Sequence, residues 1–217
     1  MVMVMGIISN MDCLLDYANH SDIHKNKGYI MNIIFCHGVM PPEMDWNARE
    51  YYPGNWEHWL QFRVEKEHEV IMQIPKFPHA HALLMKYDEW EKIMDFQDIN
   101  PDTVLIGHSA GGGFVLKYLA THPELKVKQA ILVAPWIDPN NIQPNRFYKD
   151  FDLNNSIEKQ TRYGIDMFVS SDDMDDILQS TDKIKQNISN IRVHEFQNRG
   201  HFCSPELPEI LDIIKFD

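Results

Sequence analysis

Apolar residues along the chain recur in short runs of strand length, separated by longer segments with helical spacing. The short runs lie at residues 33–36, 69–74, 103–106, 129–133, 165–170 and 191–196. Helical patterns occupy most of the intervals, at 56–66, 84–96, 112–122, 176–188 and 205–215. Strands that alternate with helices indicate parallel βαβ units, whose sheet is covered on both faces. The pattern therefore predicts an α/β fold with a mostly parallel β-sheet of about six strands and helices on both faces.

Two segments do not follow this alternation. Residues 135–160 are rich in Asn, Pro and Asp with a few aromatic residues, which predicts a cap or lid-like segment. Residues 1–30 have weak periodicity, and we interpret them as an N-terminal appendage of unclear role. The rest contains no repeat, low-complexity tract or second domain, so residues 31–217 are expected to form a single domain.

Charge restricts the class of ligand. The chain has 217 residues and a formal net charge of −12, without a basic cluster that would reverse the charge locally. Such a chain repels phosphate backbones and anionic lipids. We therefore expect a small-molecule substrate and neither nucleic acid nor a membrane as partner; the oligomeric state is not indicated.

The cysteines and the N-terminus bear on location. Three cysteines without CxxC spacing argue against a disulfide framework and a structural zinc site, and they fit a reducing compartment. The apolar opening MVMVMGII lacks a basic region before it and is too short to cross a bilayer. These features predict a cytoplasmic protein.

The strongest chemical signal is GHSAG at residues 107–111, between a buried strand and a helix that ends at Pro123. GxSxG in this context is a sharp strand-to-helix turn in which the glycines make room for close backbone and the central residue is strained. Ser109 would then project above the sheet edge, where the backbone N–H of Ala110 can donate to an oxyanion. The alternative is a turn that only packs a helix on a sheet.

A nucleophilic serine requires a base and an acid, in the order Ser, Asp/Glu, His for this type of turn. His201 follows the last predicted strand and is preceded by a glycine, so it is the candidate base. The acid is less defined. Several carboxylates follow the fifth predicted strand, and any of them could instead serve to stabilise the N terminus of the next helix. The choice of the acid is therefore open among Asp172, Asp173, Asp175 and Asp176.

From Met31 onward the chain resembles the α/β-hydrolase superfamily, and within it the small serine hydrolases of the YdeN and retinoblastoma-binding protein 9 type. The residues that carry the resemblance are His37-Gly38, Asn55-Trp56, Trp59-Leu60, Pro75, Glu89-Trp90, the GHSAG motif, Ser171-Asp172-Asp173 and Gly200-His201-Phe202. The resemblance implies Ser109 as nucleophile, His201 as base and Asp173 as its partner, with Asp172 as the second choice.

The resemblance also implies a compact serine hydrolase with little lid. It places a second oxyanion donor at the backbone N–H of Val39, and this chain departs from the relatives by a longer segment at 39–54. Hydrolysis by a serine, a histidine and an aspartate requires no cofactor, so none is expected. No metal is expected either, because His79 and His81 have no third ligand at metal-site spacing and are better explained as a loop.

Two further groups lie near the candidate site. Cys203, two residues after His201, is expected to be a buried neighbour rather than a rival nucleophile. The aromatic residues of the 135–160 segment could line an acyl pocket or belong to the core; they are Trp136, Phe147, Tyr148 and Phe151.

Together these features predict a serine hydrolase that cleaves a carboxylic ester or similar acyl bond through an acyl-enzyme on Ser109. Two alternatives stay open. An acyltransferase or thioesterase would use the same triad with a different acceptor or leaving group. A non-catalytic binding module would use the same fold without turnover.

Overall fold

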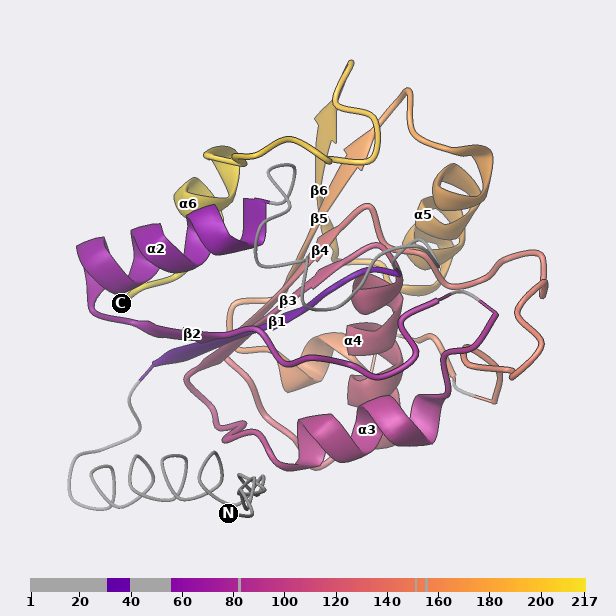
Figure 1. Ribbon diagram of the computed structural model, residues 1–217, viewed down its shortest axis with the longest axis horizontal. Coiled ribbons are helices and arrows are strands. Elements are labelled where there is room, and N and C mark those ends of the chain that lie inside the picture. Colours follow the sequence, from indigo (N-terminus) through magenta and orange to yellow (C-terminus); the bar gives the residue numbers. More distant parts are fainter. Residues whose placement is uncertain (1–30, 40–55, 82, 151, 155) are drawn as a thin grey trace, which may run out of the picture. The chain divides into compact units, whose positions relative to one another are not determined.

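The computed structural model describes residues 31–39, 56–81, 83–150, 152–154 and 156–217, and these contain one sheet of six parallel strands (Figure 1). The predicted appendage at 1–30 and almost all of the 39–54 segment lie outside the described residues. The strand order is β2-β1-β3-β4-β5-β6. The strands are β1 (Asn32–Cys36), β2 (Ile71–Gln73), β3 (Thr103–His108), β4 (Gln129–Val133), β5 (Ile165–Ser170) and β6 (Arg192–Phe196). The predicted fold class is confirmed.

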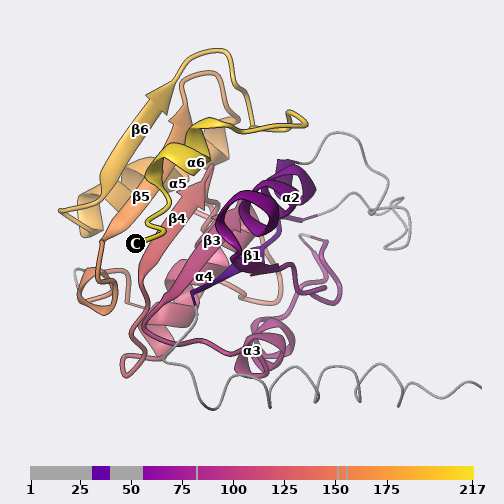
Figure 2. The same ribbon diagram turned by 90° about the vertical axis from the view of Figure 1, so that its left-hand side faces the viewer.

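The helices cover both faces of the sheet. They are α2 (Trp56–His68), α3 (Tyr87–Asp95), α4 (Ala110–Thr121), α5 (Asp175–Asn187) and α6 (Glu209–Ile213). Figures 1 and 2 show α2 and α6 on one face and α3, α4 and α5 on the other. Among the described residues, every helix is too short or too polar to cross a bilayer.

The strand order reverses direction next to β1, because β2 lies on one side of it and β3 to β6 on the other. The connections that leave β1 and β3 therefore run to opposite faces of the sheet. In open parallel sheets such a reversal opens a crevice at the carboxyl ends of the two strands, where ligands bind. The GHSAG motif follows β3 at this position.

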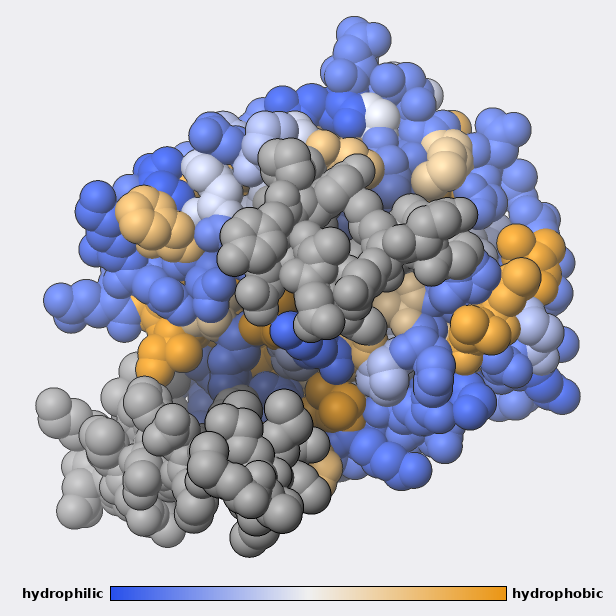
Figure 3. Space-filling view, viewed as in Figure 1, coloured by the Kyte–Doolittle hydropathy of each residue, from blue (hydrophilic) through white to orange (hydrophobic). Residues whose placement is uncertain are grey.

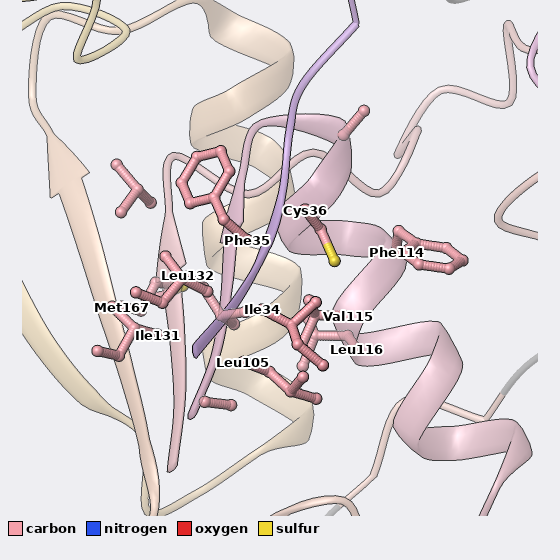
Figure 4. Packing of buried hydrophobic residues seen from close by; sticks show 14 of the residues in the cluster. Ile34, Phe35, Cys36, Leu105, Phe114, Val115, Leu116, Ile131, Leu132 and Met167 are labelled. Carbon is pink, nitrogen blue, oxygen red and sulfur yellow. The ribbon is translucent and has the colours of Figure 1, made fainter. Parts of the chain in front are cut away.

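Side chains of the central strands are buried on both faces, which explains why their sequences are continuously apolar. In Figure 4, Ile34 and Cys36 of β1 point toward α4, and Phe35 points to the opposite face. On that face the ring of Phe35 meets the Trp56 ring of α2 edge-on, with centroids 5.1 Å apart. Side chains on the two faces of β1 therefore pack this strand between α4 and α2.

Helices α3 and α6 are shorter than the sequence pattern predicts. Helix α3 begins at Tyr87 instead of residue 84, because the N–H groups of Leu84 and Met85 donate to the carbonyl of His81 in a preceding turn. Helix α6 is confined to Glu209–Ile213, directly after Pro208. Apolar periodicity alone does not distinguish a helix from an adjoining turn that also contains apolar residues.

The surface seen in Figure 3 is mostly hydrophilic, and apolar side chains reach it in separate places. The large apolar residues that are exposed are spread over several elements and connections of the described chain: Phe62, Ile71, Leu83, Leu84, Phe96, Ile142 and Met174. Scattered apolar residues of this kind are usual on a folded domain.

A buried carboxylate joins the last strand to the rest of the sheet. Asp166 of β5 accepts hydrogen bonds from Arg192 at 2.6 and 2.9 Å and from His194 Nε2 at 2.8 Å, both on β6. The amide of Gln129 on β4 donates to the same carboxylate at 2.7 Å. Burial alone raises the pKa of Asp166, but the hydrogen bonds from Arg192, His194 and Gln129 outweigh burial and lower it.

The lowered pKa of Asp166 predicts that its contribution to stability depends on pH. Because the pKa of Asp166 is lower in the folded chain, its stabilisation is complete above the ordinary value of 3.8 and is lost as the pH falls below it. Asp166→Asn should lower the free energy of unfolding by about 2 kcal/mol at neutral pH and by less near pH 3. Urea unfolding at both pH values measures this difference, with Asp182→Asn, at an exposed position of α5, as control. An equal loss at both pH values would contradict the assignment.

Candidate active site

Ser109 occupies the turn between β3 and α4 in a conformation that few residues other than glycine adopt. Its backbone angles are φ 56° and ψ −123°. The Ser109 N–H donates to the Val133 carbonyl, and the Ser109 carbonyl accepts from the N–H of Trp136, both at 2.9 Å. A strained conformation persists only where the surroundings fix it, and here both backbone groups of the residue are bonded to the end of β4 or to the connection that follows it.

The two glycines of the motif are required by close backbone. A Cβ on Gly107 would lie 2.5 Å from the carbonyl oxygen of Gly111, and a Cβ on Gly111 would lie 1.9 Å from the carbonyl oxygen of Cys36. Neither distance is compatible with a side chain. The first turn of α4 is therefore packed directly against the end of β1, as the GxSxG pattern predicts for a sharp turn.

The same packing places the residue after His37 beside Ser109. A Cβ built on Gly38 would lie 2.9 Å from Ser109 Cβ and 3.4 Å from its hydroxyl oxygen. Val39, the predicted second oxyanion donor, follows Gly38 and is partly buried against the core. Ala110, the predicted first donor, is fully buried at the start of α4.

His37 orients the peptide that joins Gly38 to Val39. Its Nε2 accepts the Phe77 N–H at 3.1 Å, so the ring proton is on Nδ1, which donates to the Gly38 carbonyl at 2.8 Å. In a trans peptide the N–H points away from the carbonyl. The N–H of Val39 therefore points away from the buried His37 ring.

Asp173 and His201 are in direct contact. His201 Nδ1 donates to the Asp173 carboxylate, at 3.0 Å to Oδ1 and 3.2 Å to Oδ2. Asp173 is buried after β5, and its Oδ1 also accepts the Met174 N–H at 2.7 Å. His201 is partly exposed. Of the four candidate carboxylates, Asp173 is the one whose side chain the structure brings to the histidine ring.

Asp172 has different partners from Asp173. Its Oδ1 accepts from the hydroxyl of Ser170 at 2.5 Å and from the Gly200 N–H at 3.1 Å. The hydrogen bond from Ser170, followed by that from the Gly200 N–H, lowers the pKa of Asp172. The second-choice acid is thus bonded to the backbone that precedes His201 and not to its ring.

His108 links the serine turn to the histidine loop. Its Nε2–H donates to the carbonyl of His201 at 2.9 Å, and the two rings are 5.0 Å apart between centroids. Ser109 and His201 both belong to the described part of the chain, and no hydrogen bond joins the Ser109 hydroxyl to the His201 ring. Hydrogen bonds of this kind are often long in free enzymes and shorten when substrate binds. Sequence reasoning missed His108, although it is adjacent to the predicted nucleophile.

The expectation that Cys203 is buried is wrong. The residue is exposed, and its thiol lies 3.7 Å from the His201 carbonyl. Partial burial of the sulfur, and then the charges of Asp173 and Glu57, raise the pKa of this thiol. A raised pKa reduces the thiolate population and so disfavours Cys203 as a nucleophile.

Of the aromatic residues in the 135–160 segment, some lie in the core and one lies at the strand-to-helix turn around Ser109, which we call the elbow. Phe147 is fully buried and packs edge-on against Trp90, with ring centroids 5.0 Å apart. Tyr148 lies at the elbow, where its hydroxyl donates to the Ala110 carbonyl at 2.7 Å. Trp136 is also buried, and Phe151 lies outside the described residues.

A lysine of α4 bonds the same segment to this helix. Lys117 donates to the carbonyls of Phe147 and Lys149 at 2.8 and 2.7 Å, and its ammonium lies 4.2 Å from the Tyr87 ring centroid. Burial lowers the pKa of Lys117. The segment is therefore bonded to α4, which begins directly after Ser109.

His79 and His81 lie in the connection between β2 and α3. His79 Nδ1 is 2.8 Å from a carboxylate oxygen of Glu89, and His81 Nδ1 accepts the Leu83 N–H at 3.2 Å. In the described ranges, no group of three His, Cys, Asp or Glu side chains is arranged to hold a metal ion.

The parallel sheet, the strained serine after β3 and the Asp–His contact after β5 and β6 define the α/β-hydrolase class. A family model described as serine aminopeptidase, S33 (Hydrolase_4) matches residues 80–207, more than half of the chain. The chain belongs to this family of α/β hydrolases. No curated protein matches the sequence.

Solved structures of hydrolases share the fold at low sequence identity. YdeN of Bacillus subtilis superposes with a TM-score of 0.69 and 20% identity, covering 84% of this chain and 96% of its own. A carboxylesterase structure from Nitrososphaera gargenis gives 0.56 and 12%, covering 86% and 89%. Naproxen esterase of B. subtilis gives 0.52 and 12%, covering 86% and 82%. The predicted likeness to YdeN is therefore found in the structure. At these sequence identities, such a likeness establishes the fold alone.

The close packing at the elbow predicts a large loss of stability on adding one methyl group. Gly111→Ala would place Cβ against the Cys36 carbonyl, so the free energy of unfolding should fall by about 3 kcal/mol or more. Gly200→Ala is the matched control, because nothing lies within 4 Å of its Cβ position and only the positive φ of 49° opposes it. That variant should lose about 1 kcal/mol in chemical denaturation. A Gly111→Ala variant as stable as the Gly200→Ala variant would refute the packing.

Proposed function

We propose that the protein is a serine hydrolase that cleaves a carboxylic ester or similar acyl bond of a small molecule through an acyl-enzyme on Ser109. The observation that carries the proposal is the hydrogen bond from His201 Nδ1 to Asp173, because it assigns the ring proton to Nδ1. In the neutral ring, His201 Nε2 is then the nitrogen without a proton and can accept the proton of Ser109.

In the proposed reaction, the Ser109 oxygen attacks the acyl carbon while His201 takes its proton. The oxyanion that forms is stabilised by the N–H of Ala110, by the N terminus of α4 and by the N–H of Val39. His37 supports the last assignment, because its bond to the Gly38 carbonyl fixes the peptide that carries this N–H. His201 then protonates the leaving group, and a water molecule activated by the same ring releases the acid and restores the serine.

The comparisons support a hydrolase that acts on esters, since the structural neighbours include carboxylesterases. The net charge of −12 favours a substrate other than nucleic acid or an anionic membrane. Free thiols at Cys36 and Cys203 are consistent with a cytoplasmic location, which we include in the proposal.

Labelling with a fluorophosphonate tests whether the serine is activated. Intact mass spectrometry should detect one adduct on the wild type and none on Ser109→Ala, because the reagent modifies only an activated nucleophile. His201→Ala should slow labelling by about three orders of magnitude, since it removes the base. Circular dichroism of each variant provides the control for folding.

Absence of an adduct on folded wild-type protein would contradict the proposal and favour the non-catalytic binding module. An adduct that persists in Ser109→Ala would contradict the assignment of the nucleophile.

The assignment of the acid has its own test. Asp173→Asn should lower kcat for p-nitrophenyl acetate by about 10³- to 10⁴-fold with little change in KM, because an amide stabilises the wrong tautomer of His201. Steady-state kinetics measures both constants. Equal activity of Asp173→Asn and wild type would remove Asp173 from the triad.

A further inference from the structure

The loop that carries His201 is weakly packed in its middle. Gly200 has a positive φ of 49°, and no atom outside its neighbours lies within 4 Å of the position of a Cβ. The next firmly packed residue is Phe202, which is buried and meets the Phe196 ring edge-on with centroids 5.5 Å apart. Hydrogen bonds, more than side-chain packing, must therefore set the path of the backbone just before His201.

The hydrogen bonds to the backbone N–H groups of Arg199 and Gly200 come from the end of β5, and the Arg199 side chain also donates to Glu209 of α6 at 2.9 Å. The Arg199 N–H donates to the hydroxyl oxygen of Ser170 at 3.1 Å, and this hydroxyl donates to Asp172 Oδ1 at 2.5 Å. The Gly200 N–H donates to the same oxygen at 3.1 Å. One carboxylate oxygen thus fixes two consecutive backbone N–H groups, one directly and one through a buried serine.

We propose that Asp172 is a positioning residue that sets the backbone of Arg199 and Gly200 so that the His201 ring meets Asp173. Two consecutive carboxylates then have different tasks. Asp172 bonds the backbone before the histidine, and Asp173 bonds the histidine ring. The inference deepens the proposed function, because it assigns a residue to the base of that reaction.

An ionised carboxylate suits this position chemically. It has only acceptor sites, and both groups that face its Oδ1 are donors. The hydrogen bond from Ser170 and that from the Gly200 N–H lower the pKa of Asp172, so it keeps its charge at neutral pH. An alanine would leave the Ser170 hydroxyl and the Gly200 N–H without this partner, whereas an asparagine keeps one acceptor oxygen.

The central experiment compares Asp172→Ala and Asp172→Asn with the wild type. Asp172→Ala should lower kcat for p-nitrophenyl acetate by roughly 10- to 100-fold with KM nearly unchanged, as expected when a catalytic group is displaced by about 1 Å. Asp172→Asn should recover most of kcat. Asp175→Ala, in the same acidic run but exposed at the start of α5, is the matched control and should retain wild-type values.

A double variant separates positioning from a general loss of stability. In a His201→Ala background, Asp172→Ala should not reduce the residual rate further, because its effect passes through the histidine. A further loss of the same size would overturn the inference. If Asp172→Ala does not fold, Ser170→Ala tests the same hydrogen bonds and should lower kcat in the wild-type background only.

Amide hydrogen exchange gives a readout that does not require activity. Exchange of the Gly200 amide should become at least tenfold faster in Asp172→Ala and stay unchanged in Asp175→Ala. Unchanged exchange and unchanged kcat would overturn the inference while leaving the proposed function intact. Failure of the proposed function would appear separately, as wild-type protein that fluorophosphonate does not label.

Discussion

The arrangement of the candidate site depends on one steric constraint, the contact between the first turn of α4 and the carbonyl end of β1. A Cβ atom built on Gly111 would lie 1.9 Å from the Cys36 carbonyl oxygen, so the helix can pack this closely on the sheet only if residue 111 has no side chain. This approach forces the backbone of Ser109 into its strained turn and brings Gly38 alongside it. Ser109 and Gly38 are thereby held side by side at the carboxyl ends of β3 and β1, where the strand order reverses.

Around this constraint, polar side chains at one strand end repeatedly bond the backbone of another. His37 after β1 accepts the Phe77 N–H after β2, His108 of β3 donates to the His201 carbonyl after β6, and Asp172 after β5 accepts the Gly200 N–H after β6. Connections at the edge of a parallel sheet have few regular hydrogen bonds of their own. Side-chain to backbone bonds between them supply the missing order, so that residues from four connections keep a common geometry.

Much of this architecture could be predicted from sequence, because strands buried on both faces are continuously apolar and the GHSAG spacing has a steric meaning. The sequence alone could not show which of the two neighbouring residues, Asp172 or Asp173, contacts the His201 ring. Neighbouring side chains in a turn point in directions set by its dihedral angles, and the hydrogen bonds of Ser170 and Gly200 that fix those angles are tertiary. The exposure of Cys203 and the late start of α3 were misjudged for the same reason, since both depend on local turns.

The strand that leads to His201 is also an edge of the sheet. In the described part of the sheet β6 pairs with β5 alone, so one row of its backbone groups is open to pairing with another strand. Its sequence RVHEF has ionisable side chains at three of five positions, and those of Arg192 and His194 bond Asp166. Charged edge strands resist the addition of a foreign strand. The contacts that hold β6 in register therefore also protect the sheet against edge-to-edge aggregation.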